Sequence, residues 1–146
     1  MTFYPSGSTY VLKASGVQTG AMVDTLGDAF QIPQPYNRCV ALLDVTATVT
    51  DATDYLDVYL DWSLDGVTYF NGVHFTQVAG NATAIKHFAV LDPANPGTAT
   101  FNVTSDCTSG VTKPSLCGPF IRPRWTITEA GTVNAAFTFS ITFYTQ

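Results

Sequence analysis

Apolar and polar residues alternate along several stretches of the chain, most clearly at residues 39–50, 55–63 and 135–146. A period of two places successive side chains on opposite faces of a strand, so one face of each stretch is apolar. The apolar faces are Ala41, Leu43, Val45, Ala47 and Val49; Leu56, Val58, Leu60 and Trp62; and Phe137, Phe139, Ile141 and Phe143. The pattern predicts three half-buried strands, with threonine and aspartate on their outward faces.

A hairpin follows the second of these strands, at "SLDGVTY". Asp65-Gly66 between two alternating runs is a strong turn signal, because glycine tolerates the positive φ that such a turn requires. The return strand is expected within residues 67–78, with Gly72 marking a bulge.

Further strand candidates are residues 9–15, 84–91, 98–103 and 120–128, with one or two short strands between residues 16 and 37. "DPANPG" predicts a loop, and residues 105–119 read as irregular. Pro123 predicts that residues 120–128 form an edge or bulged strand, because proline cannot donate to the ladder.

About eight strands, with no 3.6-residue period, predict an all-β fold: a single-domain antiparallel β-sandwich of jelly-roll type. Residues 1–8 mix aromatic residues with turn formers and are expected to form an N-terminal arm, and residues 9–146 the sandwich.

The composition agrees with this fold and narrows the range of partners. Of the 146 residues only 12% are charged, the net charge is −5, and Glu129 is the one glutamate. Six Lys plus Arg residues are too few for a phosphate-binding surface, so no nucleic acid partner is expected. No window approaches about 18 apolar residues and the start lacks a secretory signal pattern, so we expect neither a membrane span nor export.

The three cysteines, Cys39, Cys107 and Cys117, include no CxxC pair, so neither a zinc site nor a disulfide framework is indicated. Cys107 and Cys117 could bridge the loop "CTSGVTKPSLC", but three unbridged thiols are favoured in a chain without an export signal.

Asp57, Asp61 and Asp65 recur at intervals of four residues. On a strand the first two lie about 13 Å apart, whereas glycosidase carboxyl pairs are about 5 to 9.5 Å apart. The favoured interpretation is a solvated face for Asp57 and Asp61, and turn or loop roles for Asp65, Asp51 and Asp54. A calcium or catalytic role remains the alternative.

No nucleophile, metal or nucleotide motif accompanies His74 or His87, so no enzyme and no cofactor is expected. Arg122 and Arg124 flank Pro123 beside Trp125. An exposed arginine pair next to an aromatic ring could anchor a protein interface or a glycan, although isolated surface arginines explain the pattern equally well.

The stretches "LDVYLDWSLDGVTYFNGVHFTQV" and "FIRPRWTITEAGTVNAAFTFSITFYTQ" resemble small virion proteins of tailed phages, the capsid decoration (cement) proteins. The resemblance covers residues 39–146 and departs at Tyr69, where a tryptophan is common. It implies a β-sandwich or jelly-roll module on the capsid exterior, often a trimer.

The leading hypothesis is therefore a structural virion protein that binds the major capsid protein lattice from outside and stabilises it. It would assemble in the host cytoplasm as a homo-oligomer, with a homotrimer favoured. Candidate capsid or subunit contacts are Phe3, Tyr4, Arg122 and Arg124.

Two alternatives belong to other classes. The first is a carbohydrate-binding module or tail-associated receptor binder that uses Trp62, Trp125 or the tyrosines as sugar platforms. The second is a hydrolase with a loop-built carboxylate site.

Overall fold

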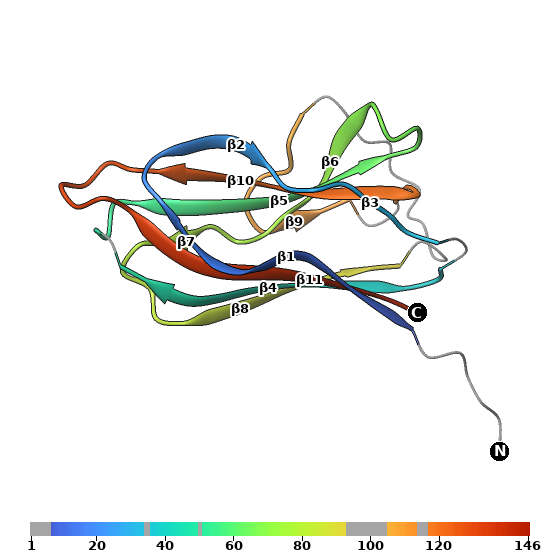
Figure 1. Ribbon diagram of the computed structural model, residues 1–146, viewed down its shortest axis with the longest axis horizontal. Helices are drawn as coiled ribbons and strands as arrows, with labels where there is room; N and C mark the ends of the chain where they lie inside the picture. The colour runs from blue at the N-terminus through green and yellow to red at the C-terminus, as the bar shows by residue number, and fades with distance from the viewer. Residues whose placement is uncertain (1–6, 34–35, 50, 93–104, 114–116) are drawn as a thin grey trace, which may run out of the picture.

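The computed structural model describes residues 7–33, 36–49, 51–92, 105–113 and 117–146. Within these ranges the chain forms eleven strands in two antiparallel sheets that face each other (Figure 1), which confirms the all-β sandwich. The strands are β1 (Ser8–Thr19), β2 (Met22–Leu26), β3 (Phe30–Gln31), β4 (Cys39–Thr48), β5 (Tyr55–Ser63), β6 (Tyr69–His74), β7 (Val78–Ala79), β8 (Ile85–Leu91), β9 (Val111–Thr112), β10 (Phe120–Thr128) and β11 (Ala136–Thr145).

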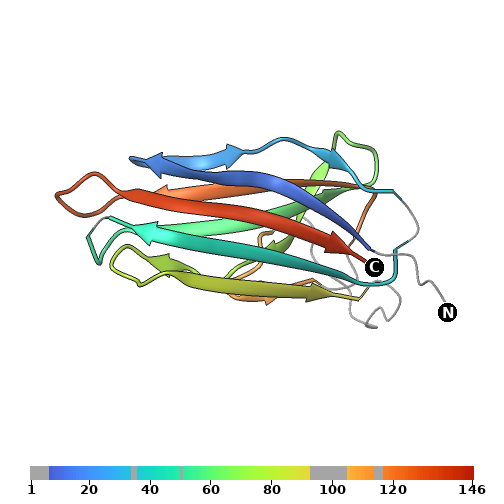
Figure 2. The same cartoon turned by 60° about the horizontal axis from the view of Figure 1, so that its bottom comes forward.

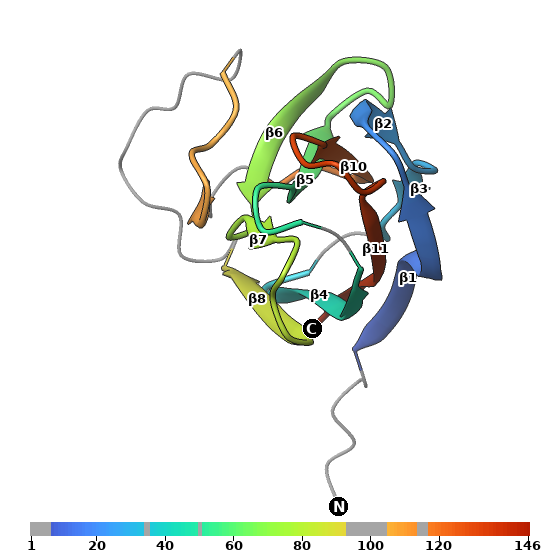
Figure 3. The ribbon, with the colours of Figure 1, turned by 90° about the vertical axis from the view of Figure 1, so that its left-hand side faces the viewer.

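The four-stranded sheet has the order β1-β11-β4-β8, and these strands lie side by side in Figure 2. The second sheet has the order β2-β10-β5-β6-β9, with β3 added to β10 and β7 to β5. Seen end-on, the two sheets form opposite walls of the molecule (Figure 3). The strand expected at residues 98–103 lies outside the described residues.

The pairings of the longer strands are nested. β1 pairs with β11, β2 with β10, β4 with β8, and β5 with β6, as in one long hairpin that has been rolled up. Pairing of β4 with β11 and of β5 with β10 then completes the two sheets. This is the arrangement of a jelly roll.

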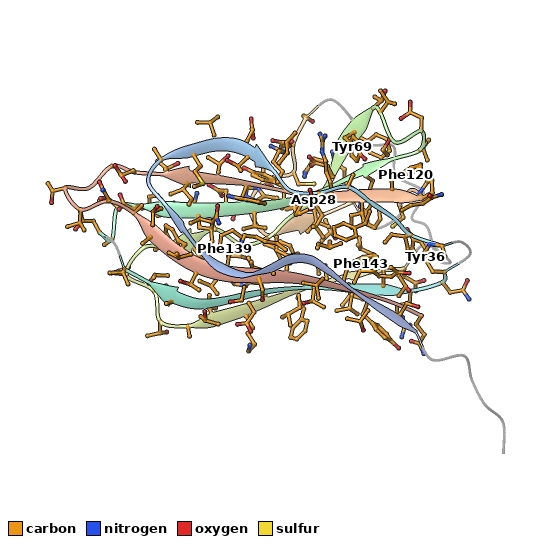
Figure 4. The ribbon with its side chains drawn as sticks, in the orientation of Figure 1. Asp28, Tyr36, Tyr69, Phe120, Phe139 and Phe143 are labelled. Carbon is orange, nitrogen blue, oxygen red and sulfur yellow. The ribbon has the colours of Figure 1, made fainter. Side chains whose placement is uncertain are left out.

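The core lies between the sheets and is built from the predicted apolar faces. Leu56, Val58, Leu60 and Trp62 of β5 are at most 1% exposed, and the four apolar residues of β11 are fully buried. Phe139 and Phe143 project between the sheets in Figure 4. Trp62 packs edge-on against Phe143 with ring centroids 5.6 Å apart, so the two sheets interdigitate.

The apolar face of β4 ends earlier than the alternation predicts. Ala41, Leu43 and Val45 are fully buried, but Ala47 and Val49 are exposed, which corrects the prediction for these two residues. The register with β11 shifts between Thr138 and Phe139, so β4 carries an extra residue at this point. Such a bulge turns the following side chains to the other face of the strand.

β10 is a central strand, so the prediction of an edge strand from Pro123 is wrong. Its register with β5 runs unbroken from Phe120 to Thr128. On its other side the partner is interrupted between β2 and β3, and the Pro123 carbonyl accepts from Gly27 N at 2.9 Å there. The missing N–H of Pro123 therefore faces the gap between two short strands, where no ladder bond is lost.

The β5–β6 hairpin is confirmed. Asp65 Oδ1 accepts from the N–H groups of Val67 and Thr68 at 2.8 and 2.7 Å, and Gly66 has a φ of 76°. The Thr68 and Val67 backbone bonds lower the pKa of Asp65 to about 2. The register shift beside Gly72 is the predicted bulge. No helix in the described ranges is long and apolar enough to cross a membrane.

Candidate functional site

The outer face of the second sheet carries a network of charged side chains from β2, β10, β5 and β6. Asp57 and Asp61 lie on this face, as the alternation of β5 predicts, but they are only 8% and 4% exposed. The expectation of a solvated face is therefore wrong. Arg124 binds Asp61, whereas His74 and Gln77 bind Asp57. A local pattern along β5 carries no information about these partners.

Arg124 is the centre of the network. Its Nε and Nη2 donate to Asp61 at 2.9 and 3.3 Å, and its Nη1 donates to Asp24 at 2.6 Å. Nη1 and Nη2 also donate to the two carboxylate oxygens of Asp106 at 3.2 and 2.8 Å. All five N–H groups of the guanidinium are thus matched to three carboxylates. We define Arg124, Asp24, Asp61 and Asp106 as the arginine cluster.

The sheet register explains how the cluster forms. Arg124 lies opposite Tyr59, and its guanidinium stacks 4.2 Å from the centre of that ring. Asp24 approaches from β2 with a φ of 46°, in the left-handed region that aspartate tolerates better than most residues. Burial opposes the charge of Arg124, but the bonds to Asp61 and Asp106 outweigh it and raise the Arg124 pKa above its usual value.

The segment 105–113 crosses from the arginine cluster to the edge of β6. Asn71 Oδ1 accepts from Cys107 N at 2.8 Å, and Gly72 O accepts from Lys113 N at 2.7 Å. Gln77 N donates to Ser109 Oγ at 2.8 Å. The Asn71 side chain and backbone groups of β6 and Gln77 therefore hold a segment that was predicted to be irregular, and part of it becomes β9.

His74 and Asp57 form a second polar contact under this segment. His74 Nε2 lies 2.8 Å from Asp57 Oδ1, and Nδ1 lies 2.9 Å from Cys107 O. Both ring nitrogens are thus within hydrogen-bond distance of an oxygen atom. Burial alone would raise the pKa of Asp57, but the bonds from His74 and Gln77 prevail and lower it.

A hollow of about 550 Å³ opens beside the arginine cluster. Tyr69 and Arg122 line it, and the Arg122 guanidinium stacks 3.9 Å from the Tyr69 ring centre. Tyr69 is on the outer side of the second sheet, away from the core phenylalanines (Figure 4). Polar groups line much of the hollow. Arg124 is one of them, but all five of its guanidinium N–H groups are already engaged, so it has none left to bind an added anion.

The predicted contact residues lie in different environments. Arg124 is 9% exposed and saturated, so the exposed arginine pair expected from the sequence is not present. Arg122 keeps 25% of its side chain exposed and lies 3.9 Å from Asp61. Phe3 and Tyr4 lie outside the described residues. The role of all four as interface contacts stays a prediction.

Sequence reasoning missed Asp24, Asp106 and Asn71, which come from three separate segments and carry no shared motif. Neither tryptophan forms an open platform, since Trp62 is 0% and Trp125 is 6% exposed. Among the described residues no group of three or more His, Cys, Asp or Glu side chains could hold a metal ion. In the arginine cluster the Arg124 guanidinium occupies the position between the three carboxylates that a metal ion would need.

The outer face of the four-stranded sheet is different, because large apolar side chains are exposed on it, beside threonines and the Lys86–Asp44 ion pair. Two cross-strand rows follow from the register: Phe88, Leu42, Thr142 and Val11, and Val90, Val40, Tyr144 and Thr9. Phe88 is 67%, Val90 58% and Val11 56% exposed. We call these eight residues the apolar rows. They span all four strands that face the viewer in Figure 2.

The fold is shared with chains of a virus. A chain in the structure of infectious bursal disease virus, Gx strain, aligns with 98% of this chain at a TM-score of 0.59 and 9% identity. A chain from the Gt strain aligns with 99% at a TM-score of 0.51 and 10% identity. No protein-family model and no curated protein matches.

This chain spans 33% and 36% of the lengths of those two viral chains, about a third of each. At such low identity the likeness shows the fold alone. The chain is thus a two-sheet β-sandwich with jelly-roll topology, of a kind that is also present in a virus.

Proposed function

We propose that the chain is a structural component of a virus particle, a decoration protein that binds the outside of a phage capsid lattice and stabilises it. The apolar rows carry this proposal. Large exposed apolar side chains in one continuous area are uncommon on proteins that remain monomeric, and such areas mark interaction sites. The shared fold with virus chains supports the same assignment.

The shape of the apolar rows suits a flat partner. Each row crosses four paired strands, so its side chains are fixed by the sheet and lose little conformational entropy on docking. Phe88 offers an aromatic anchor at the outermost strand, β8, and Val90 extends the contact along that strand. The proposed partner is the major capsid protein, and many weak copies of this contact would add by avidity across the shell.

The opposite face supports a role without catalysis. In the arginine cluster each N–H of Arg124 is engaged, and His74 has both ring nitrogens engaged. These groups hold the segment 105–113 against the sheet, and they offer no activated nucleophile. The proposed role is structural and requires neither catalysis nor a cofactor.

The remaining contacts belong to the same proposal. Residues 1–8 would act as an arm that adds Phe3 and Tyr4 to a capsid or subunit contact, and Arg122 would contribute from the rim of the hollow. The favoured assembly is a homotrimer on the capsid exterior.

The test uses the purified chain and empty expanded capsids of a virus whose genome encodes it. Saturable co-sedimentation with the capsids, together with a trimeric mass by sedimentation, is the expected result. A glycan array serves as the second arm. Binding to glycans without binding to capsids would contradict the proposal.

The second candidate is a carbohydrate-binding protein, and the hollow of about 550 Å³ is the observation that favours it. Its carboxylates, Asn71 and Tyr69 could serve sugar hydroxyls, although the tryptophan platforms expected for this class are buried. Saturable binding to a glycan that is lost in Tyr69→Ala would favour this candidate.

A further inference from the structure

Two of the three cysteines lie together at one end of the sandwich. Cys107 is elsewhere, held by Asn71 and His74 on the outer face of the second sheet. Cys117 instead packs against the hydrophobic core, and its thiol shares a hydrogen bond with the thiol of Cys39. None of the three is in a disulfide in this structure. The pair that is close in space differs from the pair that is close in sequence.

A contact from Tyr36 supports this arrangement independently of the thiols. Cys39 begins β4 and lies between Thr145 of β11 and Leu91 of β8. On the other side, the hydroxyl of Tyr36 donates to Gly118 O at 3.1 Å, and Ile32 N donates to Pro119 O at 2.7 Å. The Tyr36 bond thus ties the chain before β4 to the residue after Cys117, and the Ile32 bond holds Pro119 next to β3 within the second sheet.

We propose that Cys39 and Cys117 are a site of covalent modification, at which a small disulfide such as oxidised glutathione converts the two thiols into an intramolecular disulfide. The product would join β4 of the four-stranded sheet to the segment that leads into β10 of the other sheet. Thiols that already share a hydrogen bond need only a small movement to reach the bonded distance of about 2.05 Å.

The surroundings assign different roles to the two sulfurs. Cys117 is partly exposed, and the hydrogen bond from Cys39 lowers its pKa. Cys39 is 0% exposed, and the hydrogen bond with Cys117 together with burial raises its pKa. Oxidised glutathione can reach the partly exposed Cys117 thiol but not the fully buried Cys39 thiol, so Cys117 reacts first.

The exchange balances in two steps. The Cys117 thiolate attacks one sulfur of oxidised glutathione, which gives a mixed disulfide and expels one glutathione thiolate. Cys39 then loses its proton and attacks the Cys117 sulfur, which releases the second glutathione as its thiolate. The two protons of the protein thiols end on the two glutathione molecules, and the protein loses two electrons to the glutathione disulfide.

A consequence follows for the virion, and unlike the disulfide itself it rests on the proposed function. A decoration protein assembles in a reducing cytoplasm and then leaves the cell on the particle. The chain would fold and dock with both thiols reduced, and it would acquire the cross-link afterwards. The two sheets would then be joined when the particle meets external stress.

The test is incubation of the native full-length chain with oxidised glutathione, followed by thiol titration and mass spectrometry of unreduced peptides. The thiol count should fall from three to one, with residues 39 and 117 in one cross-linked peptide and Cys107 still reduced. The variant Cys107→Ala should form the same cross-link, and Cys39→Ala should stop at a glutathione adduct on Cys117.

Three outcomes would overturn the proposal. They are a link between Cys107 and Cys117, a stable glutathione adduct on Cys117 in the native chain, and three thiols that persist after prolonged incubation. The native chain and Cys107→Ala are compared under the same conditions, so a folding defect in Cys39→Ala does not affect the result.

Discussion

Arg124 is the residue on which the second sheet depends most. Its guanidinium joins β10 to β5, to β2 and to the segment 105–113 through three carboxylates. Asp61 is the buried partner, with 5% of its side chain exposed, whereas Asp24 and Asp106 are 61% and 49% exposed. Solvent screens the two exposed pairs, so the bond to Asp61 dominates the energy.

Replacing Arg124 therefore tests this contact. Arg124→Met removes the close cation of the buried Asp61 carboxylate and leaves it with Arg122 at 3.9 Å, so the free energy of unfolding should fall by about 3 kcal/mol. Urea unfolding measures it. The matched control Arg38→Met changes an exposed arginine and should cost less than about 0.5 kcal/mol. Equal losses in the two variants would contradict the central role of Arg124.

Asp57 gives the chain an acid-sensitive contact. Its pKa is lowered in the folded state, so below the ordinary value of 3.8 the unfolded chain binds the proton more readily. The stabilisation is complete above pH 3.8 and is lost as the pH falls through the folded pKa. In Asp57→Asn the free energy of unfolding should depend less on pH in this acidic range. Identical pH profiles for the native chain and the variant would exclude this role.

At the scale of elements, the Asn71 side chain of β6 is one of the groups that hold the segment 105–113, beside the backbone pairing of β6 with β9. Asn71→Ala removes the acceptor for Cys107 N and a buried donor to Val73 O, Leu60 O and Asp61. Amide hydrogen exchange should rise in the segment 105–113, while the amides of β11 stay protected. Mass spectrometry of exchanged peptides measures both regions. A uniform rise over the whole chain would instead indicate global destabilisation.

The strands could be predicted because their faces differ locally. In β5 and β11 the alternation alone identifies every buried apolar residue. The prediction of buried and edge positions fails where distant parts of the chain decide the outcome. Val49 faces outward because β4 has a bulge where it pairs with β11. Pro123 fits in a central strand because the strand beside it is interrupted between β2 and β3. The burial of Asp61 also depends on a partner 63 residues away, Arg124, which the pattern of β5 cannot contain.

At the scale of the whole molecule, the jelly roll separates two unlike outer faces. On the outer face of the second sheet, polar side chains bind one another in the arginine cluster and bind the segment 105–113. The four-stranded sheet leaves the apolar rows open, with Phe88 and Val90 on its terminal strand β8. The sequence predicts a sandwich of two sheets, but neither the strands of each sheet nor which outer face stays open, because the latter depends on where the segment 105–113 docks.

The central claim is that the apolar rows bind the capsid, and one comparison tests it directly. Phe88→Asp places a charge within the rows, whereas Val67→Asp places the same charge on the β5–β6 turn, where Val67 is 82% exposed. Affinity for empty capsids is measured by co-sedimentation. Phe88→Asp should weaken binding at least about tenfold, the effect of about 1.4 kcal/mol, and Val67→Asp should bind as the native chain does. Native affinity in Phe88→Asp, or an equal loss in Val67→Asp, would contradict the account.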